Sequence, residues 1–278
     1  MFDRISSGKC CYCGVSVASD VRRDLDHYRP VNAVQYDNLK YQYGYYWLSA
    51  DWDNLITSCH PCNSLEEREI FIVSTQRFID KIVGKWIHFP LNNPPTTGPS
   101  HVIGYGGEEP LIFNPFKEDP KIYFEYVFLN HERGNLIYIK PKDGLNELDN
   151  KIAINSLSIL GLNRMELCRD RHDQYTLTAL TLNNLQNAIN SKKKTIISDL
   201  LKDLLNRIDS SITYSSFSGM LWSQFSIVFF NTANKLAVLE NRQLVVNNEL
   251  NVISEMKYFQ NTYKLRAVPQ PIILVPRN

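Results

Sequence analysis

Apolar and polar residues follow three different patterns along the chain. Residues 64–86 are rich in glutamate and carry apolar residues at mixed spacing, and we predict a helix there. Residues 111–140 carry alternating aromatic and apolar positions, with turn-forming residues at Asn130 and at Gly134-Asn135. This pattern predicts a short β-hairpin. From about residue 151 onward the spacing becomes helical.

Three apolar stripes recur at helical spacing in the C-terminal part. Stripes of this kind are the buried faces of amphipathic helices, and we interpret all three as core. The stripes are Ile196, Leu200, Leu204 and Ile208 with Ile197, Leu201 and Leu205 beside them; Leu177, Leu180, Leu185, Ala188 and Ile189; and Phe217, Met220, Leu221, Phe225, Val228 and Phe229.

Proline and glycine mark the boundaries between these regions. Residues 89–110 are rich in both, which predicts an irregular segment at the surface. Residues 272–275, between two prolines, read as an extended edge segment. The expected fold class is α+β, with an N-terminal module over residues 1–88, an irregular, β-containing connection over 89–150 and a mainly helical domain over 151–278.

The cysteines give the sharpest chemical signal. Four of the six form two Cys-x-x-Cys pairs, Cys10 with Cys13 and Cys59 with Cys62. Each pair makes a tight turn that directs two thiolates toward one point, so two pairs suit a tetrahedral structural Zn²⁺. Such a site has no open coordination position and does no chemistry itself. Reduced, unmetallated thiols are the alternative, and Cys11 and Cys168 read as ordinary free thiols.

Composition and charge limit the classes of protein that fit. Hydrophobic residues make up 44% of the 278 residues, which excludes a mainly disordered chain. The 30 basic and 29 acidic residues nearly cancel, so any polyanion must be bound by a local patch. Residues 1–4 show no apolar signal core, and no apolar run approaches the roughly 18 residues that span a bilayer. We therefore expect a cytoplasmic protein with no membrane partner.

The segment between the two cysteine pairs carries candidate catalytic groups. Asp26 offers a hard oxygen ligand suited to Mg²⁺ or Mn²⁺, and Asn63 adds a neutral oxygen ligand at the start of the next helix. The neighbouring His27 can take a proton from water near neutral pH. Asn54 could hold the loop beside it. This set suits one-metal hydrolysis of a phosphodiester, whereas a purely structural Asp26–His27 pair is the competing interpretation.

These residues lie in motifs that resemble a known family. The motifs are Lys9-Cys10-Cys11-Tyr12-Cys13-Gly14, Asp26-His27-Tyr28-Arg29-Pro30, Tyr45-Tyr46-Trp47-Leu48, Trp52-Asp53-Asn54-Leu55 and Ser58-Cys59-His60-Pro61-Cys62-Asn63. Together they resemble the HNH endonuclease, or ββα-metal, family, and more narrowly the HNH proteins of bacterial anti-phage systems such as Septu and its retron-associated relatives. The likeness continues to about residue 175 through Phe89-Pro90-Leu91, residues 109–115, Asp119-Pro120 and Gly161-Leu162-Asn163-Arg164.

The resemblance implies a role for each matched residue. It implies His27 as general base, Asn54 as the central positioning residue, and Asp26 and Asn63 as ligands of a catalytic Mg²⁺ or Mn²⁺. The four paired cysteines would be ligands of a structural Zn²⁺. It also implies an N-terminal HNH nuclease module, a nucleic-acid substrate (DNA favoured, RNA such as tRNA as the alternative) and an ATPase partner.

Two other functions compete with an endonuclease. The chain could be a catalytically inactive, zinc-stabilised module that binds nucleic acid or a partner. Residues 151–278 could also be the working part, binding the ATPase through the aromatic stripe, which is compatible with nuclease activity. Arg22, Arg23 and Arg29 suit phosphate binding or solvated charge about equally. For the aromatic residues between 41 and 52, packing is favoured over base stacking.

Overall fold

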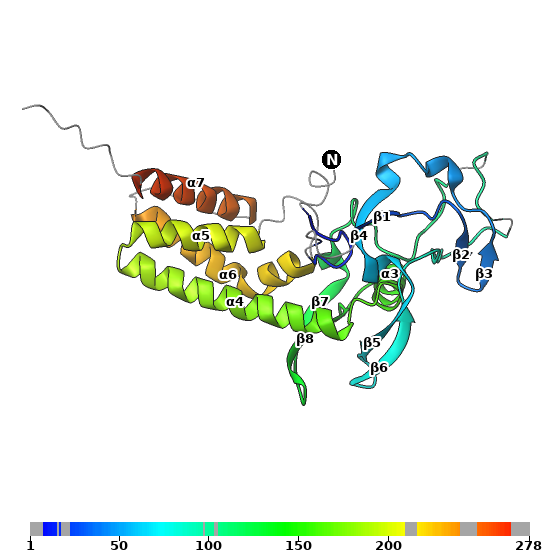
Figure 1. Ribbon diagram of the computed structural model, residues 1–278, viewed down its shortest axis with the longest axis horizontal. Helices are drawn as coiled ribbons and strands as arrows, with labels where there is room; N and C mark the ends of the chain where they lie inside the picture. Colours follow the sequence, from blue (N-terminus) through cyan, green and yellow to red (C-terminus); the bar gives the residue numbers. More distant parts are fainter. Residues whose placement is uncertain are drawn as a thin grey trace, which may run out of the picture. The chain divides into compact units, whose positions relative to one another are not determined.

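The chain forms two compact units that are described separately. This computed structural model describes residues 8–15, 17, 23–96, 98–102, 105–208, 216–239 and 249–267. The first unit contains the described residues up to Asp173 together with Ser216–Met220, and the second contains Gln174 to Ile208 and the described residues from Leu221 onward. The first unit mixes strands and helices, whereas the second is helical (Figure 1).

Two antiparallel strands and a short helix form the centre of the first unit. Strand β1 (Arg23–His27) pairs with β4 (Leu55–Cys59), with Arg23 opposite Cys59 and His27 opposite Leu55. Helix α2 (His60–Asn63) follows β4 directly, so Asn63 ends this helix and does not begin it as expected. The first cysteine pair lies in a turn that is tied to β4 by a hydrogen bond from Cys11 N to Thr57 O of 2.9 Å.

The connection between β1 and β4 is made of short elements. Strands β2 (Val34–Tyr36) and β3 (Leu39–Tyr41) form a small hairpin, and two 3₁₀ helices follow, η1 (Tyr46–Leu48) and η2 (Trp52–Asn54). The Asp51 side chain caps η2 by accepting a hydrogen bond from Asp53 N at 3.0 Å. This cap fixes the turn that delivers Asn54 to the start of β4.

The helix predicted over residues 64–86 is wrong. The segment forms an antiparallel hairpin of β5 (Glu66–Ile72) and β6 (Arg77–Val83), with Glu66 opposite Val83 and Ile72 opposite Arg77. Several of its apolar residues are β-branched, a type that favours strands. The buried Phe71 ring packs 4.7 Å from that of Tyr138, so tertiary contact outweighs the helix propensity of the glutamates.

The hairpin predicted within residues 111–140 is confirmed. Strands β7 (Phe124–His131) and β8 (Gly134–Pro141) pair from Phe124 opposite Pro141 to His131 opposite Gly134. The irregular character expected for residues 89–110 is confirmed, because the described residues there contain only an isolated bridge between Leu91 and Pro110. The expected surface position is only partly right, because Phe89 and Leu91 are buried in the core. The short helix η3 (Pro120–Ile122) precedes β7.

One apolar core joins the N-terminal turn, the β1–β4 pair and the irregular connection. Helix α3 (Glu147–Ile159) contributes Ile152 and Ala153 to this core and begins at Asn146, whose side chain accepts a hydrogen bond from Asp149 N at 2.8 Å. Tyr12, from inside the first cysteine pair, meets Phe113 edge-on with ring centroids 6.2 Å apart. The connection thus packs directly against the cysteine turn.

The C-terminal part is helical, as predicted. Its helices are α4 (Met165–Asn190), which begins in the first unit, α5 (Lys194–Ile208), α6 (Ser216–Leu239) and α7 (Glu249–Ala267). Helices α5 and α7 are joined by a hydrogen bond from Ser198 Oγ to Gln260 O of 3.0 Å. No helix in the described part of the chain is long and apolar enough to cross a membrane.

The three stripes are only partly core. Most of their described members are buried, but four are exposed, so each buried face is narrower than the spacing indicated. The exposed residues are Leu177, Leu180, Ile196 and Val228. The extended segment expected at 272–275 lies outside the described residues.

Replacement of Gly84 by Ala tests how the chain turns after β6. Gly84 has a φ of 129°, and an added Cβ would lie 2.0 Å from the carbonyl oxygen of Ser64. We expect Gly84→Ala to cost about 2 kcal/mol or more and to lower the melting temperature by about 4 °C or more. Gly106→Ala is the control, because its Cβ meets no atom within 4 Å. Equal melting temperatures for the two variants would contradict this account.

Candidate functional site

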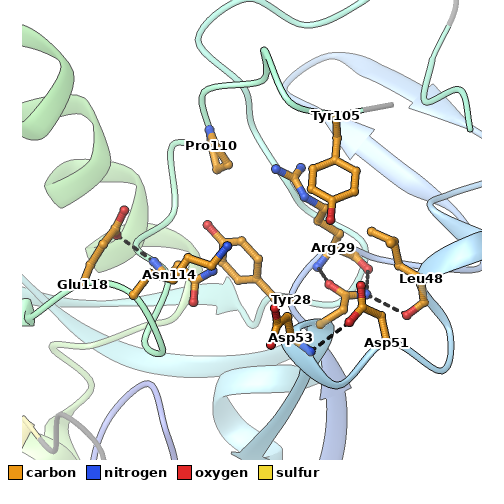
Figure 2. A pocket seen from close by; sticks show the side chains of 11 residues that line it. Tyr28, Arg29, Leu48, Asp51, Asp53, Tyr105, Pro110, Asn114 and Glu118 are labelled. Carbon is orange, nitrogen blue, oxygen red and sulfur yellow. Dashed lines mark hydrogen bonds between the residues drawn. The ribbon is translucent and has the colours of Figure 1, made fainter. Parts of the chain in front are cut away.

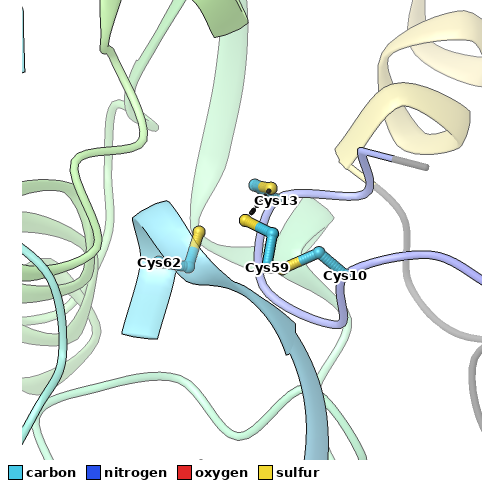
Figure 3. A group of neighbouring side chains, drawn as sticks. All are labelled: Cys10, Cys13, Cys59 and Cys62. Carbon is cyan, nitrogen blue, oxygen red and sulfur yellow. Dashed lines mark hydrogen bonds between the residues drawn. The ribbon is translucent and has the colours of Figure 1, made fainter. Parts of the chain in front are cut away.

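The four paired cysteines come together in one buried cluster. Their Sγ atoms all lie within 4.8 Å of one another, and none of the four residues is more than 1% exposed. Cys10 and Cys13 come from the N-terminal turn, Cys59 ends β4 and Cys62 lies in α2 (Figure 3). A compact, water-excluded set of four sulfur ligands fits the size and ligand preference of Zn²⁺. These four cysteines could hold a zinc ion.

The two remaining cysteines lie outside the cluster, and both are buried as well. Burial raises the pKa of the Cys11 thiol to about 12, although a backbone hydrogen bond from Thr57 opposes the shift. Burial likewise raises the pKa of the Cys168 thiol to about 11. Neither thiol is therefore ionised near neutral pH, which fits the expectation of ordinary free thiols.

His27 ends strand β1, and its ring is oriented by a backbone carbonyl. Its Nε2 lies 3.0 Å from Ser49 O, just after helix η1. A carbonyl oxygen can only accept a hydrogen bond, so this contact places the ring proton on Nε2. The lone pair of the neutral imidazole is then on Nδ1.

Asp26 is a buried carboxylate with a partner on each oxygen. Tyr12 donates its hydroxyl to Oδ2 at 3.0 Å, and the ammonium of Lys85 lies 3.2 Å from Oδ1. Lys85 also donates to His27 O at 2.7 Å. Burial lowers the pKa of Lys85, and the neighbouring Asp26 opposes that shift. Lys85 was not identified from the sequence, because it lies after the β5–β6 hairpin and outside every motif.

Asn54 joins two backbone segments near His27 through hydrogen bonds. Its Oδ1 accepts from Arg29 N at 2.7 Å, and its Nδ2 donates to Arg29 O at 3.1 Å and to Leu48 O at 3.3 Å. Its own carbonyl accepts from Tyr28 N at 2.8 Å. Asn54 thus joins the residues after β1 to Leu48, the neighbour of Ser49.

Asn63 is held by an acidic residue of β1. Its Nδ2 donates to Asp24 Oδ2 at 3.3 Å. The same oxygen lies 3.1 Å from His60 Nδ1, while Nε2 of that ring lies 3.2 Å from Glu66. His60 is half-buried, and both of its ring nitrogens have these partners. Glu66, which lies on β5, therefore belongs to the surroundings of α2.

One cavity brings together three of the four predicted catalytic residues. Asp26, His27 and Asn63 line a cavity of about 410 Å³, together with Lys40 and Trp86 among others. Asn54 does not line it. The volume accommodates a hydrated ion and part of a larger ligand.

Asn54 instead lines a second, smaller cavity of about 190 Å³. Figure 2 shows the side chains around this cavity. Arg29, one of the candidate phosphate-binding arginines, lines this cavity, but its side chain is already bound to other residues. Its guanidinium pairs with Glu108 at 2.5 Å and lies 4.5 Å from the centroid of the Tyr105 ring. Of the other two arginines, Arg22 lies outside the described residues and the side chain of Arg23 is not described.

The aromatic residues between 41 and 52 divide between packing and exposure. Tyr45 is fully buried and shares a hydroxyl–hydroxyl hydrogen bond of 2.8 Å with Tyr36. Tyr43, Tyr46 and Trp52 are about half exposed. Packing therefore accounts for only part of this group.

Comparison with known proteins gives one distant match. The chain is 26% identical over 174 residues to a protein named Septu protein PtuB from Bacillus mycoides (strain KBAB4). The match covers 62% of this chain and 48% of the relative, so the chain spans about half the length of that protein. No protein-family profile and no solved structure matches the chain.

Replacement of Cys59 by Ser tests the metal cluster. The variant loses one of four sulfur ligands, so we expect zinc content to fall from one ion per chain. The loss of metal-linked folding energy should exceed about 3 kcal/mol and lower the melting temperature by about 6 °C or more. Cys11→Ala is the matched control and should retain zinc. A wild-type protein that melts at the same temperature with and without a zinc chelator would refute the metal site.

Proposed function

We propose that this protein is a metal-dependent HNH endonuclease that hydrolyses phosphodiester bonds in nucleic acid, with DNA as the favoured substrate. The observation that best supports this is the cavity shared by Asp26, His27 and Asn63. It combines a base, a carboxylate and an amide at a site large enough for a phosphate. Strands β1 and β4 followed by α2 are compatible with a ββα-metal module.

His27 is the proposed general base. With its Nε2 proton donated to Ser49 O, the Nδ1 lone pair can accept a proton from the attacking water. The water oxygen forms a bond to phosphorus, the bond to the leaving oxygen breaks, and the leaving oxygen is protonated by solvent. General-base assistance is worth about 10²–10⁴ in rate.

Asn54 is proposed to contribute only by holding other groups in place. It does not line the cavity, but its hydrogen bonds hold Leu48, and Leu48 precedes the carbonyl that orients His27. Loss of the Asn54 amide would leave buried backbone groups unpaired and would release the Ser49 acceptor. Asn54 is therefore a positioning residue in this proposal.

Asp26 and Asn63 are the proposed ligands of the catalytic ion. One carboxylate and one amide make a sparse oxygen donor set, which suits Mg²⁺ or Mn²⁺ because these ions retain waters and take further ligands from phosphate. When bound, the ion would supply positive charge to the scissile phosphate and its leaving oxygen. The side chain of Lys85 also lies close to this carboxylate, 3.2 Å from Asp26 Oδ1.

A binding module without catalytic activity is the second candidate, and the Asp26 contacts favour it. Both carboxylate oxygens already have partners, and the ammonium of Lys85 would repel a divalent cation. In that case Lys85 would be the permanent counter-ion of Asp26. The cavity could still bind a phosphate of nucleic acid, with Lys40 as a cationic contact.

The biological setting is proposed from similarity. The relative is named as a Septu protein, and the motifs resemble HNH proteins of anti-phage systems. We propose an effector nuclease of such a system that works with an ATPase bound by residues 151–278. A net charge of +1 provides little nonspecific affinity for nucleic acid, so delivery to the substrate by a partner would be useful.

Replacement of His27 by Ala tests the nuclease. With Mn²⁺, we expect cleavage to fall by about 10²-fold or more, because the variant lacks the proposed general base. Zinc content and melting temperature should stay at wild-type values. His131→Ala, a histidine of the β7–β8 hairpin, serves as control and should cleave normally.

The assay should use plasmid DNA and bulk tRNA, with the chain alone and with the ATPase encoded beside it. Cleavage of DNA that requires Mn²⁺ and His27 supports the proposal. A His27→Ala variant as active as wild type would refute the assigned base. An inactive wild type that still binds DNA through the cavity would support the binding module.

A further inference from the structure

The motif Gly161-Leu162-Asn163-Arg164 has no role in the proposed reaction, yet the structure fixes it firmly. Gly161 has a φ of 56°, and a Cβ there would lie 2.7 Å from Val83 Cγ2. Asn163 pairs with Ile139 of β8, accepting from its N at 2.9 Å and donating to its O at 2.7 Å. The turn is thereby anchored to two hairpins, and the next residue, Arg164, has a defined direction.

Arg164 points into the cysteine cluster. Its Nη2 lies 3.4 Å from Cys13 Sγ and 3.7 Å from Cys59 Sγ, and its Nη1 lies 3.6 Å from Cys62 Sγ. Nη1 also donates to the carbonyl oxygens of Leu160 at 3.4 Å and Gly161 at 3.2 Å. The residue is 3% exposed, so this guanidinium meets three of the four sulfur atoms with little access to water.

The charge of a zinc site explains why a buried cation belongs here. Four thiolates around Zn²⁺ carry a net charge of −2, which is costly to bury without compensation. One guanidinium reduces this to −1, and its N–H groups can share the charge on three sulfurs. The planar fork of arginine offers several donors in fixed directions, which a single lysine ammonium cannot match.

We propose that Arg164 is the charge partner of a zinc–thiolate centre formed by the four paired cysteines, strengthening zinc binding through hydrogen bonds to Cys13, Cys59 and Cys62. The inference rests on zinc binding at the cluster and not on nuclease activity. Because Arg164 directly precedes α4, zinc binding is also linked to the ordering of that helix start. Groups that orient or polarise metal ligands typically contribute 10–100-fold to affinity.

Zinc affinity of Arg164→Met tests the proposal. We expect chelator competition to show zinc binding weakened about 10–100-fold, with Arg164→Lys in between. Arg171→Met is the matched control, because Arg171 is also fully buried but donates to Leu162 O instead of to the cluster. That variant should bind zinc as wild type does. If the two methionine variants lost zinc equally, the cause would be general destabilisation, and the proposal would be overturned.

A spectroscopic measurement covers the case in which Arg164→Met does not fold. In Co²⁺-substituted protein, hydrogen bonds to thiolate stabilise the sulfur lone pairs that give the sulfur-to-cobalt absorption bands. Arg164→Lys, with fewer directed donors, should shift those bands to lower energy, and Arg171→Lys should leave them in place. Unchanged bands in Arg164→Lys with wild-type zinc affinity would overturn the proposal. A wild-type chain that binds neither Zn²⁺ nor Co²⁺ would overturn the metal site as well, whatever the nuclease assay shows.

Discussion

The convergence of four cysteine sulfurs is the constraint that organises the first unit. It joins the N-terminal turn to the end of β4 and to α2, which follows β4 directly. Tyr12, inside the first cysteine pair, bonds to Asp26, and Asn63 directly follows Cys62. Two residues that line the larger cavity are therefore positioned by the cluster. Asn63 is the neighbour of a sulfur ligand, and Asp26 is in direct contact with the cysteine turn.

A second constraint comes from the short segment after the β5–β6 hairpin. Lys85 N donates to Cys62 O at 2.8 Å and Trp86 N to Asn63 O at 2.6 Å, which ties this segment to α2. The Lys85 ammonium then reaches both Asp26 and the backbone of His27. The same segment thus contacts both the helix and the strand that contribute Asn63, Asp26 and His27 to the cavity. It also gives Asp26 a cationic neighbour, which distinguishes this site from a simple metal-binding carboxylate.

Local signals predicted part of this arrangement. The cysteine spacing identified the cluster, because tight turns leave paired thiols few other directions. The Gly134-Asn135 signal located the β7–β8 hairpin, although the turn itself is Glu132-Arg133 and these two residues begin β8. Residues 64–86 misled because their turn lacks glycine, with Gln76 at a φ of 54°, and because their glutamates favour a helix in isolation. Lys85 and Arg164 are positioned by long-range contacts, and no local sequence pattern encodes such contacts. The resemblance singled out the motif that ends in Arg164 without indicating that this residue faces the sulfurs.

Anomalous X-ray diffraction from crystals of the His27→Ala variant, grown with zinc, Mn²⁺ and a short DNA duplex, would test the central claim most directly. Data at the zinc edge should give one peak about 2.3 Å from each of the four paired sulfurs. Data at the manganese edge should give a peak bound by Asp26 and Asn63 and facing a phosphate. A cysteine cluster without zinc, or manganese bound elsewhere while Asp26 remains paired with Lys85, would contradict the account.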